Sequence, residues 1–443
     1  MLFKLQNNIF IVGLLSIGFM AIKVYERAFC LITIVTLIAF VSQMCLLLYF
    51  SREKERNYSE STLFWTTFFY SLICGSLFMS SCYLYDGDTF MFTKKDAMIY
   101  YRESMNVTKV GMIANVKQIM EHYEFDDWGS LTFDSLMMYI IPDKFFLNLV
   151  YMLTGSLSGI LLFRIGKYLM PLSYAFLSAI TYSTSSYLIC FHCTFLKESL
   201  FVFLVICAMY FFYKVIGDGL DRSFVGVGLS LLCIMFFRPA VGAFMIISFF
   251  TYYAVTQRGA ISLFLYMLIF VALVVSLTAL QGMVDNYTGG DMDNLVDYGT
   301  KGGYSSSFSY FVSIFGALFG PFPSLFPKEE GVPLTINYYG AGLTYRLFLV
   351  YPLWIGVFWT IKKFVSLMIP ITAFVLVEML STGFVMASLE LRKVILHVPF
   401  MYVLAFFGLH RWHTEKGLEH LSESMLFTLA VGILVLWNIF RVS

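Results

Sequence analysis

The chain has 443 residues, of which 59% are hydrophobic and only 13% are charged, with a net charge of +1. A soluble domain is about 25% charged because its surface faces water. The composition therefore excludes a soluble globular enzyme and favours a protein whose surface lies in lipid. The near-zero net charge gives no global field that would attract nucleic acid or an acidic partner.

In chain order, the hydrophobic runs predict an all-α polytopic integral membrane protein. A spanning helix needs about 20 mainly apolar residues. Met1–Lys4 and the apolar run after it resemble a signal peptide, but no small-residue cleavage site follows, so we expect a retained first helix. We expect about 12–13 transmembrane helices. The runs lie at 7–24, 29–50, 62–85, 145–163, 169–190, 199–215, 223–237, 240–256, 260–281, 346–361, 364–387, 394–410 and 424–440.

The orientation follows from Lys and Arg, which concentrate in short cytoplasmic loops. Arg52, Lys54 and Arg56 place the loop after the second run inside, and with it the N-terminus. Alternation then places further basic loops inside, those with Arg164 and Lys167, Lys214 and Arg222, Arg258, Lys362 and Lys363, and Arg411 and Lys416. We therefore expect a multi-pass protein of a plasma membrane, the bacterial inner membrane, with a cytoplasmic N-terminus.

This topology divides the chain into three parts. Residues 1–61 form an N-terminal transmembrane hairpin and a cytoplasmic loop, 62–410 a membrane core, and 411–443 a C-terminal cytoplasmic loop and the last helix. Two long extracytoplasmic loops, at about 86–144 and 282–345, are expected to carry short amphipathic helices, the first of them around Ala97–Tyr101 and Val110–His122. In the second loop, the apolar stretch Phe308–Leu325 is broken by prolines and predicts an interfacial or re-entrant piece.

Several cations fall on the outer side, which the positive-inside rule disfavours. They are Lys197 at the start of the sixth run, Arg238 before Pro239 at the break between the seventh and eighth, Arg346 at the start of the tenth, and Arg392 and Lys393 between the eleventh and twelfth. Each one alone is explained by a long side chain that reaches out from a helix end. As a set they predict an anion site, because cations held at this edge suit a lipid phosphate and the guanidinium fork matches its oxygens.

The first outer loop supplies carboxylates beside these cations. Asp86, Asp88 and Asp96 are nearest the membrane, where partial desolvation raises the pKa of a carboxyl group and makes it a usable base. We expect later acidic residues of the loop, such as Asp134, to be solvated. A carboxylate loop and phosphate-binding cations at one membrane edge predict group transfer from a lipid-phosphate donor.

Two shorter patterns concern a metal and a sugar. Cys190 and Cys193 with His192 between them look like the start of a metal site, but no second ligand pair follows at zinc spacing. We therefore assign no metal ligands and leave the metal requirement open. Tyr100 and Tyr101 offer aromatic surface on which a sugar can stack, or they anchor an interfacial helix.

Four short motifs lie within about residues 62–410. They are Asp96–Tyr101 at the first outer loop, Phe195–Glu198 at the start of a middle helix, Phe237–Pro239 at a helix end, and Leu391–Lys393 with His397–Pro399 and Gly408. In their order and shared outer side they resemble motifs of the GT-C superfamily of polyprenyl-phosphate-sugar-dependent glycosyltransferases, in the style of protein mannosyltransferases and lipid A aminoarabinose transferases. The chain departs from the family pattern in its two extra helices ahead of the core and in its unpaired acidic residues at the loop start.

The resemblance implies a role for each group of residues. Asp96, or else Asp88 or Asp86, would be the base that activates an acceptor hydroxyl. Arg392, Lys197 and Arg238 would hold the phosphate of a polyprenyl-phosphate-linked sugar. The acceptor would be a glycan, a lipid or a protein.

Two other functions remain open. An O-antigen or capsular polysaccharide polymerase also has two large outer loops, but the arginines typical of its loops are nearly absent before Arg346. A lipid-linked sugar flippase or transporter would place ionisable residues at mid-membrane. In this chain Glu378 alone lies well inside a run, with no evident partner in the sequence.

Overall fold

The structure is a computed structural model, and it describes residues 9–15, 17, 27–52, 58–87, 89, 94–123, 125–219, 222–256, 333–384, 395–415 and 423–442. Every regular element among these residues is a helix. The first are α2 (Arg27–Arg52), α3 (Glu60–Asp86), α4 (Lys94–Met105), α5 (Val107–Val110), α6 (Met112–His122), α7 (Phe125–Ile140), α8 (Lys144–Leu169), α9 (Leu172–Ser183) and α10 (Ser186–Cys193). The others are α11 (Glu198–Asp218), α12 (Ser223–Met235), α13 (Pro239–Thr256), α17 (Pro333–Lys363), the 3-10 turn η2 (Ser366–Met368), α18 (Ile369–Phe384), α19 (Val398–Thr414) and α20 (Glu423–Val442).

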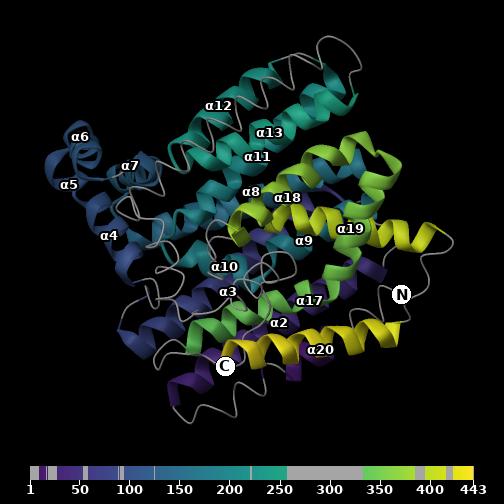
Figure 1. The fold of residues 1–443 in the computed structure, drawn as a ribbon. Coiled ribbons are helices and arrows are strands. Elements are labelled where there is room, and N and C mark those ends of the chain that lie inside the picture. The colour runs from purple at the N-terminus through teal and green to yellow at the C-terminus, as the bar shows by residue number, and fades with distance from the viewer. Residues whose placement is uncertain are drawn as a thin grey trace.

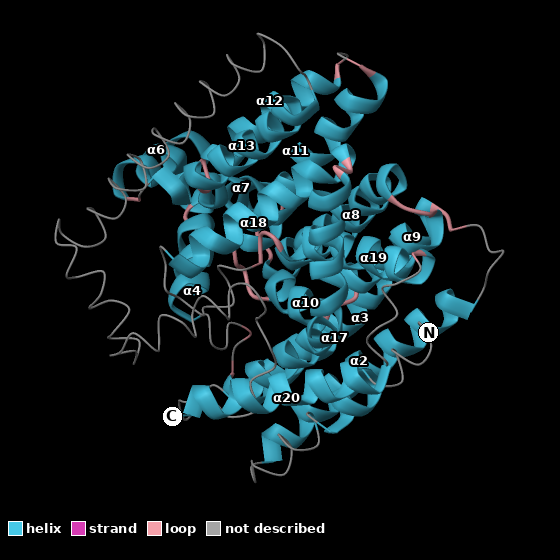
Figure 2. Cartoon of the chain, turned by 45° about the vertical axis from the view of Figure 1, so that its right-hand side comes forward, coloured by secondary structure: helices cyan, strands magenta, loops and turns pink. Residues whose placement is uncertain are grey.

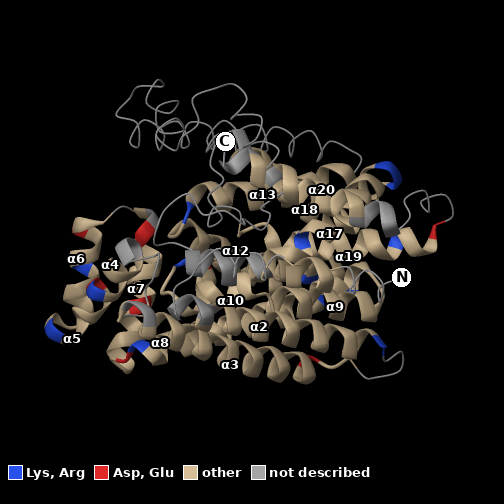
Figure 3. Ribbon diagram, turned by 90° about the horizontal axis from the view of Figure 1, so that it is seen from below, with Lys and Arg blue, Asp and Glu red and all other residues tan. Residues whose placement is uncertain are grey.

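Six stretches of the described helices are long and apolar enough to cross a membrane. They are Thr33–Arg52, Glu60–Leu84, Lys144–Leu169, Glu198–Asp218, Pro239–Thr256 and Gly342–Lys363. The long helices lie side by side in one bundle (Figures 1 and 2), and most of the charged residues gather towards its two ends (Figure 3). The chain is therefore a multi-pass helical membrane protein, as its composition predicts.

Helix starts and stops follow local signals in the sequence. The side chain of Asp143 caps α8 by accepting a hydrogen bond from the backbone N–H of Phe146 at 2.9 Å. Ser59 caps α3 in the same way. At the predicted break, α12 ends at Met235 and α13 begins at Pro239, because proline fits the first turn of a helix but not its interior.

Two predicted runs differ from the structure. The run 169–190 forms two helices, α9 and α10, with a break at Thr184 and Ser185. The tenth run was expected to begin at Arg346, but α17 begins at Pro333 and so extends into the region predicted as the second outer loop. Most of the run 7–24, all of 260–281 and most of 282–345 lie outside the described residues.

The predicted first outer loop is a group of four helices, α4 to α7, which we call the α4–α7 segment (residues 94–140). It sits at one end of the bundle (Figures 1 and 3). Tyr100, Ile119 and Leu131 form a small apolar core that holds these helices together. The two stretches predicted to be amphipathic fall in α4 and, for the most part, in α6.

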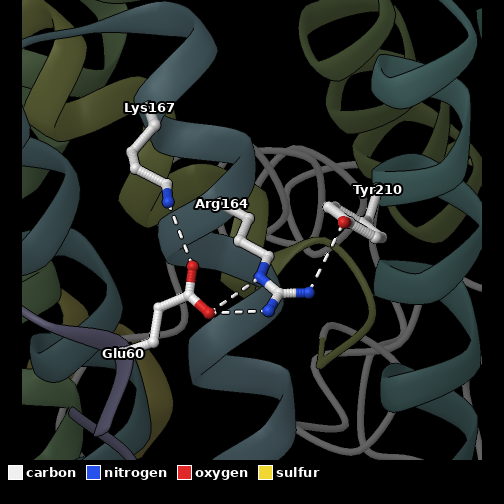
Figure 4. A network of polar contacts seen from close by, with 4 residues as sticks. All are labelled: Glu60, Arg164, Lys167 and Tyr210. Carbon is white, nitrogen blue, oxygen red and sulfur yellow. Dashed lines mark hydrogen bonds and ion pairs between the residues drawn. The ribbon is translucent and has the colours of Figure 1, made fainter. Parts of the chain in front are cut away.

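A network of polar contacts joins three helices (Figure 4). It lies at the start of α3 and the end of α8, opposite the α4–α7 segment, which follows the end of α3 and precedes the start of α8. Glu60 at the start of α3 accepts from Arg164 Nη2 at 2.6 Å and from Lys167 Nζ at 3.0 Å, both near the end of α8. Arg164 Nη1 also donates to the hydroxyl of Tyr210 on α11 at 3.4 Å. Arg164 and Lys167, two of the basic residues that the predicted topology places inside, therefore lie at the end of α8 that is away from the α4–α7 segment.

Glycines allow α17 and α19 to pack backbone against backbone. A Cβ atom on Gly408 would overlap the carbonyl oxygen of Pro352, and one on Gly356 would overlap that of Leu404. Small residues allow this approach between helices in lipid, where packing rather than water exclusion drives association. The contact fixes α19 against α17, the helix that carries Arg346.

Candidate functional site

Lys197 lies where α11 begins, as predicted, but its ammonium group is engaged by a carboxylate. Its Nζ atom is 2.5 Å from Oδ1 of Asp127 on α7, and the hydroxyl of Tyr100 on α4 donates to the same oxygen at 2.9 Å. The side chain of Lys197 is only 9% exposed. This ion pair ties the α4–α7 segment to the bundle, together with a backbone hydrogen bond from Gly129 to Phe236.

Asp134 is buried rather than solvated, which contradicts the expectation from sequence. It is 1% exposed and accepts a hydrogen bond from the hydroxyl of Tyr151 on α8. Its other oxygen, Oδ2, has no hydrogen-bond partner among the described residues. Burial raises the pKa of Asp134 to about 7, against the smaller opposing effect of the Tyr151 hydrogen bond.

Glu198 adds a second buried carboxylate beside Tyr151. It is 3% exposed at the first position of α11, and its Oε2 atom finds no partner within the described part of the chain. The charges of Asp134 and Glu198 both act on Tyr151. We call Tyr100, Asp127, Asp134, Tyr151, Lys197 and Glu198 the carboxylate cluster.

Arg346 lies inside α17 and is buried, with 6% of its surface exposed. None of its three guanidinium nitrogens has a hydrogen-bond partner among the described residues. Arg346 lies close enough to His397, Tyr187 and Tyr402 to interact with them electrostatically. Burying a guanidinium without an acceptor destabilises the fold by several kcal/mol. A bound anion would offset this cost, so Arg346 is a candidate anion ligand.

The break between α9 and α10 faces Arg346. Gly342, one turn before Arg346 on α17, lies directly against the start of α10, where a Cβ atom would meet the backbone nitrogen of Tyr187 and the hydroxyl of Ser185. The Ser185 hydroxyl donates to the carbonyl of Gly342 at 3.4 Å. The N-terminus of α10 and the guanidinium therefore bring positive charge together inside the bundle.

Glu378 has a partner that the sequence did not reveal. It lies in α18, and one of its carboxylate oxygens contacts Nδ1 of His397, just before α19. Both residues are buried. We call Arg346, Tyr187, Tyr402, His397 and Glu378 the arginine cluster.

One helix links the two clusters. The start of α10 adjoins the arginine cluster, and α10 ends at Cys193, four residues before Lys197. Since α10 has eight residues, it separates its two ends by about 12 Å.

The structure describes the side chains of only some of the other predicted site residues. Arg238 lies between α12 and α13, with its guanidinium 6.0 Å from the ring of Phe201. Tyr101 meets Phe195 edge-on at 5.5 Å, so part of its ring packs against protein. Asp86 ends α3 and Asp96 lies in α4, but their side chains are not described, and Asp88, Arg392 and Lys393 lie outside the described residues.

The Cys190–Cys193 region is buried in α10, and Nδ1 of His192 contacts the hydroxyl of Ser199 at 2.9 Å. Within the described ranges, no three His, Cys, Asp or Glu side chains are arranged to hold a metal ion. Compared with protein-family models, curated proteins and solved structures, the chain matches none of them.

Proposed function

We propose that this protein is a membrane glycosyltransferase that moves a sugar from a polyprenyl-phosphate or -diphosphate donor to a glycan, lipid or protein acceptor. The reaction would take place on the extracytoplasmic face, in the assembly of cell-surface glycans. The proposal includes a bacterial plasma membrane, a cytoplasmic N-terminus and about 12–13 spans.

The buried, unpartnered guanidinium of Arg346 is the observation that supports this function best. A buried cation inside an apolar bundle suits a lipid phosphate as its anion. The prenyl chain can stay in the bilayer while the phosphate reaches the guanidinium of Arg346. Arg offers the phosphate two parallel hydrogen bonds, and the start of α10 adds the partial positive charge of a helix N-terminus. In this proposal Arg346 is the central phosphate ligand, and Arg238, Arg392 and Lys393 remain candidates for further contacts.

The carboxylate cluster supports the second half of the reaction. Direct displacement at the sugar carbon needs one base to take the proton of the acceptor hydroxyl, since phosphate is already a good leaving group. The sequence points to Asp86, Asp88 or Asp96 for this role, and the structure adds further carboxylates in the same region. Lys197 is less suited to the phosphate than the sequence indicates, because Asp127 already engages it.

Donor binding tests the proposal directly. We would titrate polyprenyl phosphate onto the purified protein in lipid nanodiscs and compare Arg346→Gln with Arg222→Gln, whose exposed side chain lies at the start of α12. A charge-assisted contact contributes roughly 1.5–3 kcal/mol, so Arg346→Gln should weaken binding about tenfold or more. Arg222→Gln should bind as the native protein does. Equal binding by the native protein and Arg346→Gln would remove the main support for the proposal.

The arginine cluster also favours a second candidate, a lipid-linked sugar flippase or transporter. Glu378, His397 and Arg346 are ionisable groups buried in the bundle, and such groups commonly mark a substrate or proton path. Reconstituted vesicles separate the two functions. A flippase would move a labelled lipid-linked sugar between leaflets without consuming it, and Glu378→Gln would slow that movement. A transferase would release polyprenyl phosphate or diphosphate only when an acceptor is present.

A further inference from the structure

The face of α7 that meets the bundle carries two carboxylates, seven residues apart. Asp127 and Asp134 are therefore two helical turns apart on the same side of α7. Asp127 meets Lys197 and Tyr100, whereas Asp134 meets only the hydroxyl of Tyr151 among the described residues. The two carboxylates thus have different environments on one helix.

The carboxylate cluster holds more negative than positive charge. Asp127, Asp134 and Glu198 provide three carboxylates, and Lys197 is the one cation among the cluster's residues. Lys197 pairs with Asp127, whereas no ion pair of Asp134 or Glu198 is seen within the described part of the chain. Among the described contacts, α4 and α6 place the neutral side chains of Tyr100 and Asn115 against α7. Charged groups also lie nearby. Glu103 and Arg102 of α4 act on Tyr123 together with Asp127, and Lys144, the first residue of α8, lies over the rings of Tyr101 and Phe195. Burial of Asp134 without an ion-pair partner among the described residues is costly for its charged form, so Asp134 favours a bound proton.

A proton suits this place better than a metal ion. Mg²⁺ and Ca²⁺ need about six or more oxygen ligands. The Tyr151 hydroxyl donates its hydrogen to Asp134, and within the described residues no three His, Cys, Asp or Glu side chains are arranged to hold a metal ion.

We propose that Asp134 is the base that takes the proton of the acceptor hydroxyl, with Tyr151 as its positioning residue. The inference rests on the proposed transferase function and names a residue for the role that the sequence gives to Asp86, Asp88 or Asp96. Tyr151 holds Oδ1, which leaves Oδ2 to accept the proton. The pKa of about 7 fits, because a base works best when its pKa is near the working pH.

The step balances as a direct displacement. The acceptor oxygen forms a bond to the anomeric carbon of the sugar while its proton passes to Oδ2 of Asp134. The bond between that carbon and the phosphate oxygen breaks, and its electron pair leaves with the lipid phosphate. Asp134 then releases the proton to water, and no oxidant or reductant is needed.

The pH profile of transfer tests this assignment. Asp134→Asn should lower transfer by about 100-fold or more while donor binding is unchanged. In the native protein, transfer should fall as the pH drops below about 7, because Asp134 becomes protonated. Tyr151→Phe removes a hydrogen bond that lowers the pKa of Asp134, so the midpoint of this fall should move to higher pH. A midpoint unchanged in Tyr151→Phe, or near-native transfer in Asp134→Asn, would overturn the proposal.

A second measurement does not depend on activity. As the pH rises, the infrared band of a protonated carboxyl should disappear with a midpoint near pH 7. The band should be absent in Asp134→Asn. It should remain in Asp127→Asn, the matched control on the same helix. A native band that does not titrate near neutral pH refutes the proposal even if sugar transfer occurs. If the band titrates as expected but the native protein transfers no sugar, the transferase function fails while the protonation of Asp134 stands.

Discussion

At the scale of single residues, burial of Asp134 makes the stability of the fold depend on pH. Its pKa rises from 3.8, the ordinary value, to about 7 in the native state. Between these values the native state binds more protons than the unfolded state, so the free energy of unfolding falls as the pH rises from about 4 to 7. Thermal unfolding in detergent should therefore occur at a lower temperature at pH 8 than at pH 5.

Asparagine removes this dependence because it has no proton to lose. The decline between pH 5 and pH 8 should be smaller in Asp134→Asn than in the native protein. Asp127→Asn should keep the full decline in stability between pH 5 and pH 8, since Asp134 is still present. An equal decline in Asp134→Asn would assign the pH effect to another group.

The ion pair between Lys197 and Asp127 predicts coupled mutations. Because each residue is the partner of the other, Lys197→Met and Asp127→Asn should not be additive, and their coupling energy should be about 0.5–3 kcal/mol. The double-mutant cycle would be measured by chemical unfolding. If Lys197 instead served only the donor phosphate, Lys197→Met would weaken donor binding, and Asp127→Asn would not share its effect on stability.

At the scale of helices, the close contact between α17 and α19 predicts an effect of one methyl group. Gly408→Ala would place its Cβ atom against the backbone of Pro352. Backbone atoms within a helix cannot move aside as the end of a flexible side chain can. Overpacking of this kind costs about 1–3 kcal/mol, so the unfolding temperature should fall. Donor binding should weaken as well, because α17 carries Arg346 and α19 carries Tyr402.

Gly432 provides the matched control, since nothing lies within 4 Å of a Cβ atom placed there on α20. Alanine is the better helix former by about 1 kcal/mol, so Gly432→Ala should be neutral or stabilising. A similar loss of stability in both variants would mean that the α17–α19 contact is not the cause.

The helix positions followed from sequence better than the contacts between helices did. The break at Arg238-Pro239 was predictable because proline lacks the N–H that a helix interior needs. The break after Ser183 was not, because Ser and Thr fit a membrane helix, and the packing of Gly342 against α10 is a long-range contact.

The same limit applies to the candidate site. The position of Lys197 at a helix start was correct, since it depends on a local change from polar to apolar residues. The burial of Asp134 and the Glu378–His397 contact were missed, because each depends on how two helices pack. A signal was present in the seven-residue spacing of Asp127 and Asp134, which places both on one face of an amphipathic helix.

At the scale of the whole molecule, the two ends of the bundle should lie on opposite sides of the membrane. Glu60 at the start of α3 contacts Arg164 and Lys167 near the end of α8 at one end. The α4–α7 segment lies at the other end (Figure 3). Because short cytoplasmic loops are rich in Lys and Arg, we expect the first end to be cytoplasmic. The α4–α7 segment and the carboxylate cluster would then face outwards, as an extracytoplasmic transferase requires.

Labelling with a membrane-impermeant thiol reagent tests this orientation, in a variant whose eight native cysteines are replaced. Ile113 on α6 is 89% exposed, so Ile113→Cys should react in intact cells. Lys363 is exposed at the last residue of α17, so Lys363→Cys should react only after the membrane is permeabilised. The opposite pattern would place the carboxylate cluster in the cytoplasm. The donor would then have to be used on the inner face, and the proposed extracytoplasmic reaction would be wrong even if Arg346 binds phosphate.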